Sequence, residues 1–458
     1  MAPSAINACA DYASLAKVAR STAMSGLRNA LNTMHEQLWD DERSMVRLYG
    51  IHLVRETALG AFLDLENGNT ARAERALREV LKHQYPASAD PRWAGTFKTH
   101  ADQADAGTND ATGQPRTKEW HDYDPNWRQF LAMILWVTER LYGHVLSDAL
   151  RIDMQRSVTV AASSETADRI AAEYSNIALM QSWLADITGL TSTLAQQVAV
   201  QVERDGDIAE YNSPTYDAIS LLAACLLADF STSNDSRRLG ATVIDRMCSR
   251  LHEVWHPALA LQAGPHSRSY GQHPRMYVSL ISVLMAAIDI PAAGPTTLND
   301  STTHVHDLYF LPLFERLCGR LRRDFSPQPV TATRRHVQRF GDIEATSIIE
   351  PNLVVGFERG RRSRFAIDQY APFTMTSSHG ALGVRTRPDT DWVDVVEVAP
   401  HVYRVQSARR VGPDVRHDVA ALTIVASRAP VMHENELLFG EITLQFPALT
   451  VEVRLPRA

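Results

Sequence analysis

The stretch DGDIAEYNSPTYDAISLLAACLLADF, residues 205–230, decides the fold of the larger part of the chain. Its second half, residues 218–230, is almost wholly apolar, as expected of a helix that is buried on all sides. Its first half crowds carboxylates, an amide and phenols into the approach to that helix. Polar side chains at helix starts are a common way for a helical domain to form a site. We therefore predict a helical domain whose polar side chains gather where its helices begin.

A second polar stretch, GPHSRSYG at residues 264–271, follows later in the chain. In the first stretch, Ser213 suits a helix cap and Pro214 suits the first helical turn. Those local roles leave other polar side chains of the two stretches unexplained. The resulting site candidates are Asn212, Tyr216, His266 and Arg268.

Apolar residues recur at helical spacing from about residue 10 to residue 322. One expected helix carries Met45, Leu48 and His52 and ends at Gly68, and Asn69 is expected to cap the next helix. Further helices are predicted at 126–148, 166–188, 213–230, 236–255, 274–289 and 306–322. The polar segment 86–124 is predicted to be a long loop, of the kind that is usually functional or mobile.

After Arg323 the pattern changes to short runs rich in β-branched residues, which indicate strands. The polar run 374–380 is predicted to be an exposed loop between strands, and Gly412-Pro413-Asp414 is predicted to be a turn. The expected strand runs are 348–357, 393–402, 419–425 and 442–455.

Helices followed by strands indicate an α+β chain of two domains. The break falls at 324–333, where Pro327 and Pro329 interrupt the helical pattern. We expect residues 1–323 to form an α/α toroid, an incomplete helical barrel that carries the site. We expect residues 334–458 to form an antiparallel β-sandwich.

The composition is that of an ordinary globular protein, with 45% hydrophobic and 22% charged residues in a chain of 458. A net charge of −7 argues against nucleic acid as a partner, because nucleic-acid-binding proteins are usually basic. The four cysteines show neither metal-ligand nor disulfide spacing. No apolar run is long enough to span a bilayer, and residues 1–31 lack the pattern of a secretory signal peptide. The chain is therefore expected to be cytoplasmic and to have no membrane partner.

Two other predicted helices carry candidates. Asn126 and Trp127 follow Pro125, which favours a helix start. At that place Asn126 would donate a hydrogen bond and Trp127 would be a stacking platform, with a buried indole as the alternative for Trp127. Asn176 lies in an apolar stretch, where it is either a substrate ligand or a satisfied packing residue.

The order of these motifs resembles the α/α-toroid polysaccharide lyases of the chondroitin and hyaluronan lyase type, with heparinases and alginate lyases as more distant relatives. The motifs are Asn126-Trp127, Asn176, Asp205-Gly206 with Tyr216, and Ser267-Arg268. The resemblance implies a β-sandwich after the toroid, as the strand pattern also indicates. The chain departs from the family in having Glu210 and Asn212 where a histidine is usual.

The resemblance also implies roles for individual residues. Asn176 would neutralise the substrate carboxylate, Tyr216 would move the protons with His266 as its partner, and Arg268 would hold the sugar or the leaving oxygen. The expected substrate-binding residues are Asn126, Trp127, Asn212 and Tyr270. The implied reaction is a base-catalysed β-elimination that breaks a carbon–oxygen bond in an acidic saccharide or a similar carboxyl- or carbonyl-bearing substrate.

Such an elimination needs fixed donors for the enolate that develops when the proton next to a carboxyl or carbonyl group leaves. A tyrosine can exchange the proton if a nearby cation lowers its pKa, and Arg268 could be that cation. The chemistry needs no cofactor and no metal, and none is expected. The expected partner is a small molecule or an oligosaccharide, and the oligomeric state is left open.

Three alternatives remain at this point. A cytosolic dehydratase or cyclase acting on a small natural product would use the same machinery, and a catalytically dead carbohydrate-binding relative would use none. The sequence HEVWH at 252–256 matches a zinc-hydrolase motif, in which two histidines share one helical face and a glutamate serves as base. Against zinc, Pro257 ends the helix at once and no third ligand follows at a familiar spacing.

Overall fold

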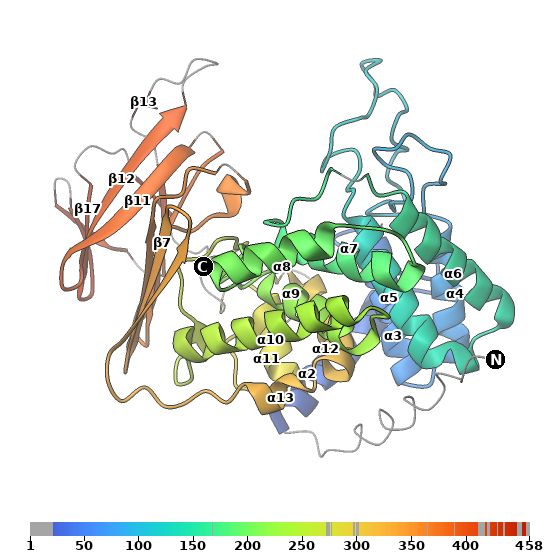
Figure 1. Cartoon of the computed structure of the whole chain (residues 1–458), viewed down its shortest axis with the longest axis horizontal. Helices are drawn as coiled ribbons and strands as arrows, with labels where there is room; N and C mark the ends of the chain where they lie inside the picture. The colour runs from blue at the N-terminus through green and yellow to red at the C-terminus, as the bar shows by residue number, and fades with distance from the viewer. Residues whose placement is uncertain are drawn as a thin grey trace.

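Helices fill the N-terminal part of the chain and strands fill the C-terminal part, and the two parts lie side by side (Figure 1). The computed structural model describes residues 22–166, 168–271, 275, 277–295, 298, 302–363, 365–388, 390–410, 417–418, 422–427, 429–433, 436–446 and 451–454. The expected order, helices first and strands second, is confirmed, and the chain is an α+β protein.

The N-terminal part is built mainly from α-helices, with short 3-10 helices and small β-hairpins between them. The α-helices are α2 (Thr22–Leu38), α3 (Val54–Glu66), α4 (Thr70–Leu81), α5 (Trp127–Tyr142), α6 (Asp148–Ser163), α7 (Ser175–Thr188), α8 (Leu194–Asp205), α9 (Asp217–Phe230), α10 (Asn234–Val254), α11 (Leu280–Ala287), α12 (Leu311–Leu317) and α13 (Leu321–Asp324). The 3-10 helices are η1 (Gly143–Val145) and η3 (Val305–Phe310). None of the described helices is long and apolar enough to cross a membrane.

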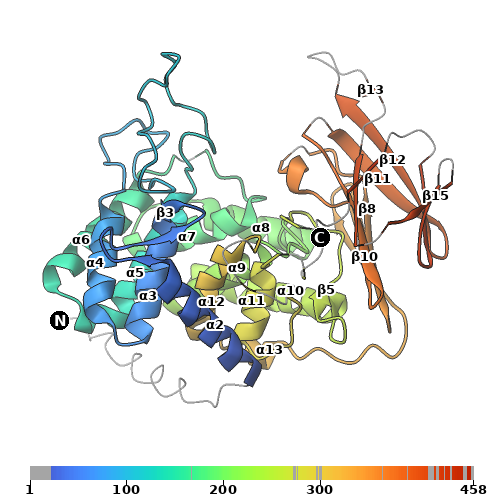
Figure 2. The same cartoon turned by 180° about the vertical axis from the view of Figure 1, so that it is seen from behind.

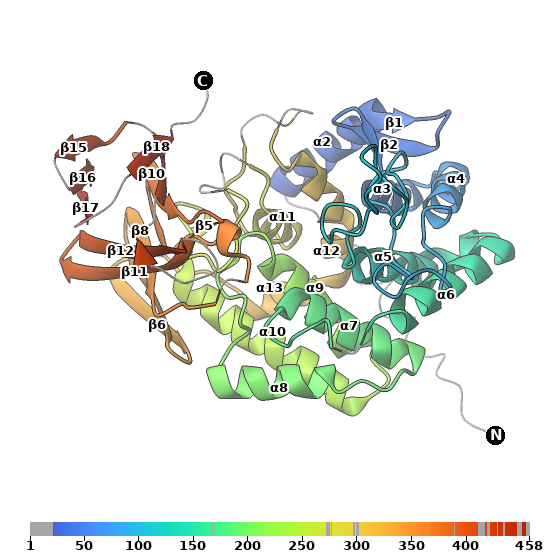
Figure 3. The same cartoon turned by 90° about the horizontal axis from the view of Figure 1, so that it is seen from above.

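Two series of helices alternate along the chain (Figure 3). In the first series α3 packs against α5, α5 against α7, α7 against α9, and α9 against α11. η3 and α12, which follow α11, return to contact α3, and α2 lies next to α11 (Figure 2). In the second series α4, α6, α8 and α10 each pack on the helix that precedes them. Residues 217–227 of α9 are all buried, as the apolar sequence predicts for a helix surrounded by others.

The predicted helix through Met45, Leu48 and His52 is wrong. Residues 39–53 form three short strands, β1 (Trp39–Asp40), β2 (Met45–Leu48) and β3 (Ile51–Leu53). Tyr49 and Gly50 both have positive φ, 56° and 81°, which is the backbone of a tight hairpin turn. The helix begins only at Val54, because the residues with helical spacing before it form the strands and turn of the hairpin.

Other helix boundaries also differ from the predicted ones. α6 and α8 were not predicted, and the predicted helix at 166–188 starts only at Ser175. Both missed helices are amphipathic, with one buried stripe and many exposed polar residues, so their signal is weaker than that of α9. The predicted loop at 86–124 is confirmed, since turns and isolated bridges occupy it and it stands out from the helices (Figure 1).

The C-terminal part contains two sheets. The first has the order β18 (Val451–Arg454), β14 (Leu422–Ala426), β10 (Gly380–Arg385), β9 (Phe373–Ser377), β8 (Leu353–Arg359), β7 (Ile343–Glu350), β6 (Arg334–Phe340). The second has the order β11 (Thr390–Ala399), β12 (Val402–Arg410), β17 (Ile442–Gln445), β16 (Glu436–Phe439), β15 (Val431–His433), with β13 (His417–Asp418) paired to β12. Most strand pairs are antiparallel, as predicted. Two pairs, β14–β18 and β12–β17, are parallel and differ from that prediction.

The two sheets share one hydrophobic core, to which Val355 and Phe373 contribute from the first sheet and Val395 and Tyr403 from the second. The predicted strand at 393–402 is two strands, because His401, with φ 62°, turns the chain back. The predicted exposed loop at 374–380 is wrong, since residues 374–377 belong to β9 and residues 373–376 of that strand are all buried. The predicted turn at 412–414 and the start of the predicted strand at 419 lie outside the described residues.

The two parts of the chain meet along residues 254–271 and the first sheet. The hydroxyl of Ser347 on β7 donates to the carbonyl of Gly264 at 2.6 Å. A Cβ atom on Gly356 of β8 would lie 1.8 Å from the carbonyl carbon of Gly264, so only glycine allows this approach. Tyr211 stacks on Phe340 with ring centres 4.4 Å apart. The stretch 264–271 is therefore held against the sheet, which fixes where Arg268 lies.

Candidate functional site

Three neighbouring helices, α5, α7 and α9, begin close together and present candidate side chains there. Asn126, Tyr174 and Tyr216 each precede the first residue of one of these helices. The side-chain amide nitrogen of Asn126 donates to the hydroxyl of Tyr174 at 2.8 Å. The guanidinium carbon of Arg268 lies 3.9 Å from the ring centre of Tyr216 and 5.3 Å from that of Tyr174. The structure thus brings together three predicted site residues, Asn126, Tyr216 and Arg268.

The hydroxyl of Ser213 joins the two polar stretches. It accepts a hydrogen bond from the main-chain N–H of Tyr216 at 3.0 Å, which is the predicted cap, although α9 itself begins at Asp217. The same hydroxyl donates to the main-chain carbonyl of Arg268 at 2.8 Å. One small side chain therefore sets the position of both Tyr216 and Arg268.

Arg268 is held in a buried ion pair. Its terminal nitrogen bonds Glu210 at 2.6 Å, and the two side chains are 7% and 3% exposed. Its Nε donates to the side-chain oxygen of Gln369, a residue of the C-terminal part, at 2.9 Å. Burial lowers the pKa of Arg268, but Tyr216 and Glu210 outweigh burial and the net pKa is raised. The guanidinium is therefore a permanent positive charge beside the Tyr216 ring.

Burial raises the pKa of Tyr216 above its ordinary value, and the positive charge of Arg268 opposes that shift without reversing it. The expected lowering of the pKa by Arg268 is therefore wrong in its net direction. The cause is burial, whose strength cannot be read from the sequence. At neutral pH the phenol is protonated, so Tyr216 is a proton donor in the resting site.

Asn176 is fully buried near the start of α7. Its main-chain N–H donates to Glu210 at 2.9 Å, which ties it to the Arg268 ion pair. Within the described part of the chain, neither the nitrogen nor the oxygen of its side-chain amide has a hydrogen-bond partner. Buried amides almost always have partners, and an orphan in a native structure needs an explanation. The side chain is fully buried, so a ligand would reach its amide only after a local opening.

Aromatic and charged side chains continue from this cluster toward solvent. The hydroxyls of Tyr216 and Tyr270 are hydrogen-bonded to each other. Tyr270 is 38% exposed and stacks on His304, with ring centres 4.5 Å apart and planes within 1°. Trp127 is half-buried, and the guanidinium carbon of Arg55, at the start of α3, lies 5.5 Å from its ring centre. The predicted residues Trp127 and Tyr270 thus lie on the solvent side of the cluster.

Two predicted residues have mainly structural partners. Asn212 has a positive φ of 47°, and its side-chain oxygen accepts from Arg250 and from Gln262, each at 3.4 Å. The side-chain oxygen of Asn212 thus belongs to a buried polar cluster, and the substrate contact of Asn212 stays a prediction. His266 donates through Nδ1 to the main-chain carbonyl of Asn212 at 2.8 Å. Burial lowers the pKa of His266 to about 4, so the ring is neutral at pH 7, with its lone pair on Nε2.

The buried cluster under the site consists of Arg250 with two carboxylates, at 2.8 Å from Asp207 and 3.3 Å from Asp217. We expect Arg250→Met to lower the free energy of unfolding by about 3–5 kcal/mol, because two buried carboxylates then lose their cation. Denaturant unfolding at neutral pH measures this. An unchanged midpoint would show that the cluster is not desolvated in solution.

The matched comparison is Asp217→Asn. Burial raises the pKa of Asp217 from 3.8 to about 6. A raised pKa means that the stability which this carboxyl contributes is present below pH 3.8 and is lost as pH rises through about 6. As pH rises from 4 to 7, the free energy of unfolding of the Asn variant should therefore increase relative to that of the parent protein, by about 1–3 kcal/mol.

The HEVWH stretch does not form the arrangement that zinc binding needs. α10 ends at Val254, and His256 lies in β4 (Trp255–His256). The Nδ1 of His256 accepts from the main-chain N–H of Leu259, and its Nε2 donates to the main-chain carbonyl of Glu350. The Nε2 of His252 bonds the main-chain carbonyl of Asp324. The two imidazoles do not share a helical face, and three of their four nitrogens already bond other groups.

A surface hollow of about 560 Å³ lies beside the β1–β3 hairpins, lined by residues 37–42 and 47–50. It is not at Tyr216, but Tyr49 in its wall packs edge-on against His306, with ring centres 6.0 Å apart. His306 is two residues from His304, which stacks on Tyr270. Ring contacts through His306, His304 and Tyr270 therefore connect the wall of the hollow with the cluster.

Residues 27–318 match the family model described as Domain of unknown function (DUF8769), which is more than half of the chain. The chain belongs to the DUF8769 family. No curated protein matches it. The DUF8769 match contains the helix starts of α5, α7 and α9 and the stretch 264–271, and it ends before β6. Gln369, which holds Arg268, lies outside the DUF8769 region.

Sequence reasoning missed several residues of the cluster. Tyr174 and Glu210 lie within a few positions of residues that were predicted, so a search around each helix start would have found them. Phe365, whose ring packs on Tyr174 with centres 4.9 Å apart, and Gln369 come from the C-terminal part. No local pattern marks those two, because their neighbours are far away in sequence. Arg55 and the histidines of η3 were also missed.

Proposed function

We propose that the DUF8769 chain is a carbon–oxygen lyase that performs β-elimination on an acidic saccharide or a similar carboxyl-bearing substrate. One observation carries the proposal. Asn176, whose buried side-chain amide has no hydrogen-bond partner among the described residues, is linked through its main chain and Glu210 to the buried guanidinium of Arg268, which lies over the protonated phenol of Tyr216. These are a donor for the enolate, a donor for the leaving oxygen and a fixed positive charge, which the reaction requires.

The proposed roles follow from the contacts of each group. The Asn176 amide would bind the substrate carboxyl group, because it is the one group of the three whose side chain is not already committed within the cluster. Arg268, fixed by Glu210 and Gln369, would hold the charge that develops beside Tyr216. Helix N-termini carry partial positive charge, so the beginnings of α5, α7 and α9 favour an anionic substrate at this place.

In the proposed step a base removes the proton from the carbon next to the carboxyl group. The electron pair forms a carbon–carbon double bond, the neighbouring carbon–oxygen bond breaks, and Tyr216 gives its proton to the leaving oxygen. His266 is the proposed base, because it is neutral and its Nδ1 proton is fixed by the Asn212 carbonyl. Burial keeps Tyr216 protonated, which suits the acid role better than the base role.

The proposal includes the architecture. The series α3, α5, α7, α9 and α11, which returns to α3 through η3 and α12, would be the inner layer of an α/α toroid, with α4, α6, α8 and α10 as its outer layer. The two sheets with their shared core would be a β-sandwich. The toroid places helix starts in a ring, which is where the candidate side chains lie.

A direct assay tests the proposal. The purified protein is incubated with uronate-containing oligosaccharides and polysaccharides and, separately, with small β-hydroxy and β-alkoxy carboxylic acids. Elimination creates a double bond conjugated with the carboxyl group, so the expected result is rising ultraviolet absorbance together with new chain ends. Hydrolysis gives new chain ends without that absorbance, and this outcome would overturn the lyase proposal. Activity on the small acids alone would leave elimination in place and favour a dehydratase.

A further inference from the structure

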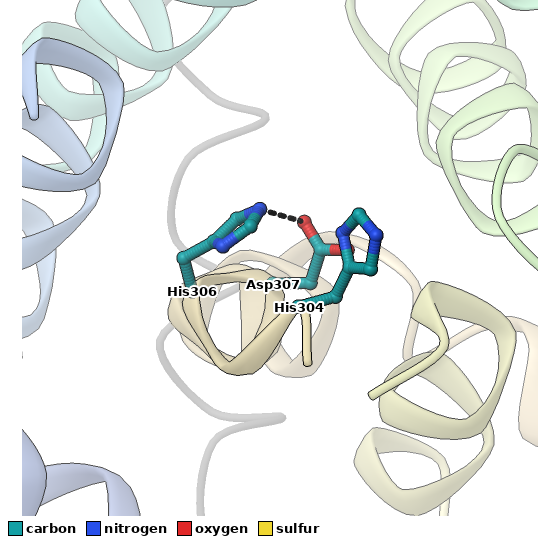
Figure 4. Close-up of side chains that lie close together, drawn as sticks. All are labelled: His304, His306 and Asp307. Atoms are coloured by element: carbon teal, nitrogen blue, oxygen red, sulfur yellow. Dashed lines mark ion pairs between the residues drawn. The ribbon is translucent and has the colours of Figure 1, made fainter. Parts of the chain in front are cut away.

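His304, His306 and Asp307 form a second cluster, at the start of η3. Figure 4 shows the Asp307 carboxylate between the two imidazoles. Each residue offers a ligand atom, and these atoms all lie within 4.8 Å of one another. The elimination proposed for Tyr216 makes no use of this cluster, and no helix pattern requires two histidines here.

The spacing within the cluster suits a shared ion better than direct contact. The Nδ1 of His304 lies 3.8 Å from one oxygen of Asp307, and the Nε2 of His306 lies 3.7 Å from the other. Both distances are too long for hydrogen bonds. Two neighbouring ligand atoms of a tetrahedral zinc ion are about 3.4 Å apart, given bonds of roughly 2.0–2.2 Å. Each imidazole is thus within a few tenths of an ångström of the spacing to an Asp307 oxygen that an ion requires, and all three ligand atoms lie within 4.8 Å of one another.

The two imidazoles are also oriented as ligands usually are. The buried Nδ1 of His304 has no hydrogen-bond partner among the residues that the structure describes. Tyr270 stacks flat on the His304 ring and fixes its plane. The Nδ1 of His306 lies 3.5 Å from the hydroxyl of Tyr49, which leaves its Nε2 facing Asp307. Metal-binding histidines typically use one nitrogen for the ion and the other for a supporting partner.

The local charge leaves room for a cation. Arg55 lies 3.6 Å from Asp307, but its short bonds, at 2.6 and 3.0 Å, go to Glu56. The single positive charge of Arg55 is thus shared between two carboxylates, Glu56 and Asp307, so this group of three side chains keeps one net negative charge. Two nitrogen ligands and one carboxylate are the donors that zinc and similar ions prefer, whereas calcium and magnesium prefer oxygen alone.

We propose that His304, His306 and Asp307 form a binding site for a divalent transition-metal ion such as zinc, at the solvent side of the Tyr216 cluster. Three protein ligands leave a fourth position for water or for a substrate oxygen. The site adjoins Tyr270, which bonds Tyr216, so a bound ion would lie next to the substrate region. This inference goes beyond the proposed elimination and does not depend on it.

Cobalt titration of the full-length protein tests the site. After treatment with a chelator and its removal, Co²⁺ is added and the visible absorbance is recorded. We expect about one equivalent to bind with ligand-field bands of a nitrogen- and oxygen-ligated ion, and Zn²⁺, which has no such bands, to bleach them. His304→Phe, which keeps a ring on Tyr270, and His306→Ala should each weaken binding by more than the roughly 10–100-fold cost of losing a supporting partner.

His252→Ala is the matched control, because it removes a histidine of the HEVWH stretch and should leave the titration unchanged. A parent protein that gives no bands would overturn the proposal. So would bands that survive both η3 variants or that disappear in His252→Ala. Melting curves identify a variant that fails to fold, and the remaining η3 variant then decides. Because the titration records the visible bands of bound Co²⁺ and needs no substrate, failure of the lyase assay and failure of the metal site are distinguishable.

Discussion

Replacing Tyr216 by phenylalanine is expected to lower kcat/KM of the proposed elimination by roughly two to four orders of magnitude, the usual worth of a general acid. The change removes only the hydroxyl. The ring keeps its place over the Arg268 guanidinium, and the hydrogen bond from the Tyr216 main chain to Ser213 does not involve the side chain. The melting temperature should therefore fall little, since the lost bond to Tyr270 is worth about 1 kcal/mol.

The control for this change is Tyr403→Phe in the second sheet. The Tyr403 hydroxyl is buried without a hydrogen-bond partner among the described residues, so its loss should leave the rate unchanged and should not lower the melting temperature. The pH profile gives a further check, because a proton donor must be protonated. The pKa of Tyr216 is raised above 10, so the rate should not fall on the alkaline side until the pH exceeds that value. A Tyr216→Phe protein that turns over normally would remove Tyr216 from the mechanism.

The second large effect is expected from Asn176→Leu, which should lower the activity without lowering the stability. If the amide holds the developing enolate, its loss should lower kcat/KM by about two to three orders of magnitude. Leucine has nearly the same size and removes two buried polar atoms that have no partners among the described residues. The free energy of unfolding should therefore stay level or rise, by up to about 1–3 kcal/mol.

Steady-state kinetics and denaturant unfolding measure the two effects. Ser182→Ala is the matched control, because Ser182 lies on the same helix and its buried hydroxyl also lacks a described partner. It should leave the rate unchanged. If Asn176→Leu lowers stability and leaves the rate intact, the amide is a packing group with a bound water, and the proposal loses its main support.

The sequence predicted the fold best where one physical signal dominates. α9 was found because its residues are apolar on every face, and strand structure at 348–357 was found because β-branched residues cluster there, although that single predicted run is two strands, the end of β7 and the start of β8. Residues 45–53 were misread because Met45, Leu48 and His52 match both a helical period and a hairpin, and only the positive φ of Tyr49 and Gly50 distinguishes them. Amphipathic helices such as α6 give weaker signals.

The site residues also divide into those with a local sequence signal and those whose partners lie far away in the sequence. Asn126 and Tyr216 were found because helix starts leave a local trace in the sequence, and the structure places them in one cluster. Asn212 was assigned to the substrate, yet its partners are Arg250 and Gln262, which no local pattern indicates. The sign of the Tyr216 pKa shift was missed because burial outweighs the nearby charge.

The guanidinium group of Arg268 donates hydrogen bonds to both parts of the chain, to Glu210 of the helical part and to Gln369 of the strand part. A rotation of one part against the other that lengthens the bond to Glu210 while the bond to Gln369 holds would draw the guanidinium away from the Tyr216 ring. The positive charge opposes the effect of burial on that phenol, so such a rotation would weaken the acidity of Tyr216. A change in the angle between the two parts would thereby change the proton affinity of Tyr216 through Gln369, a residue far from Tyr216 in the sequence.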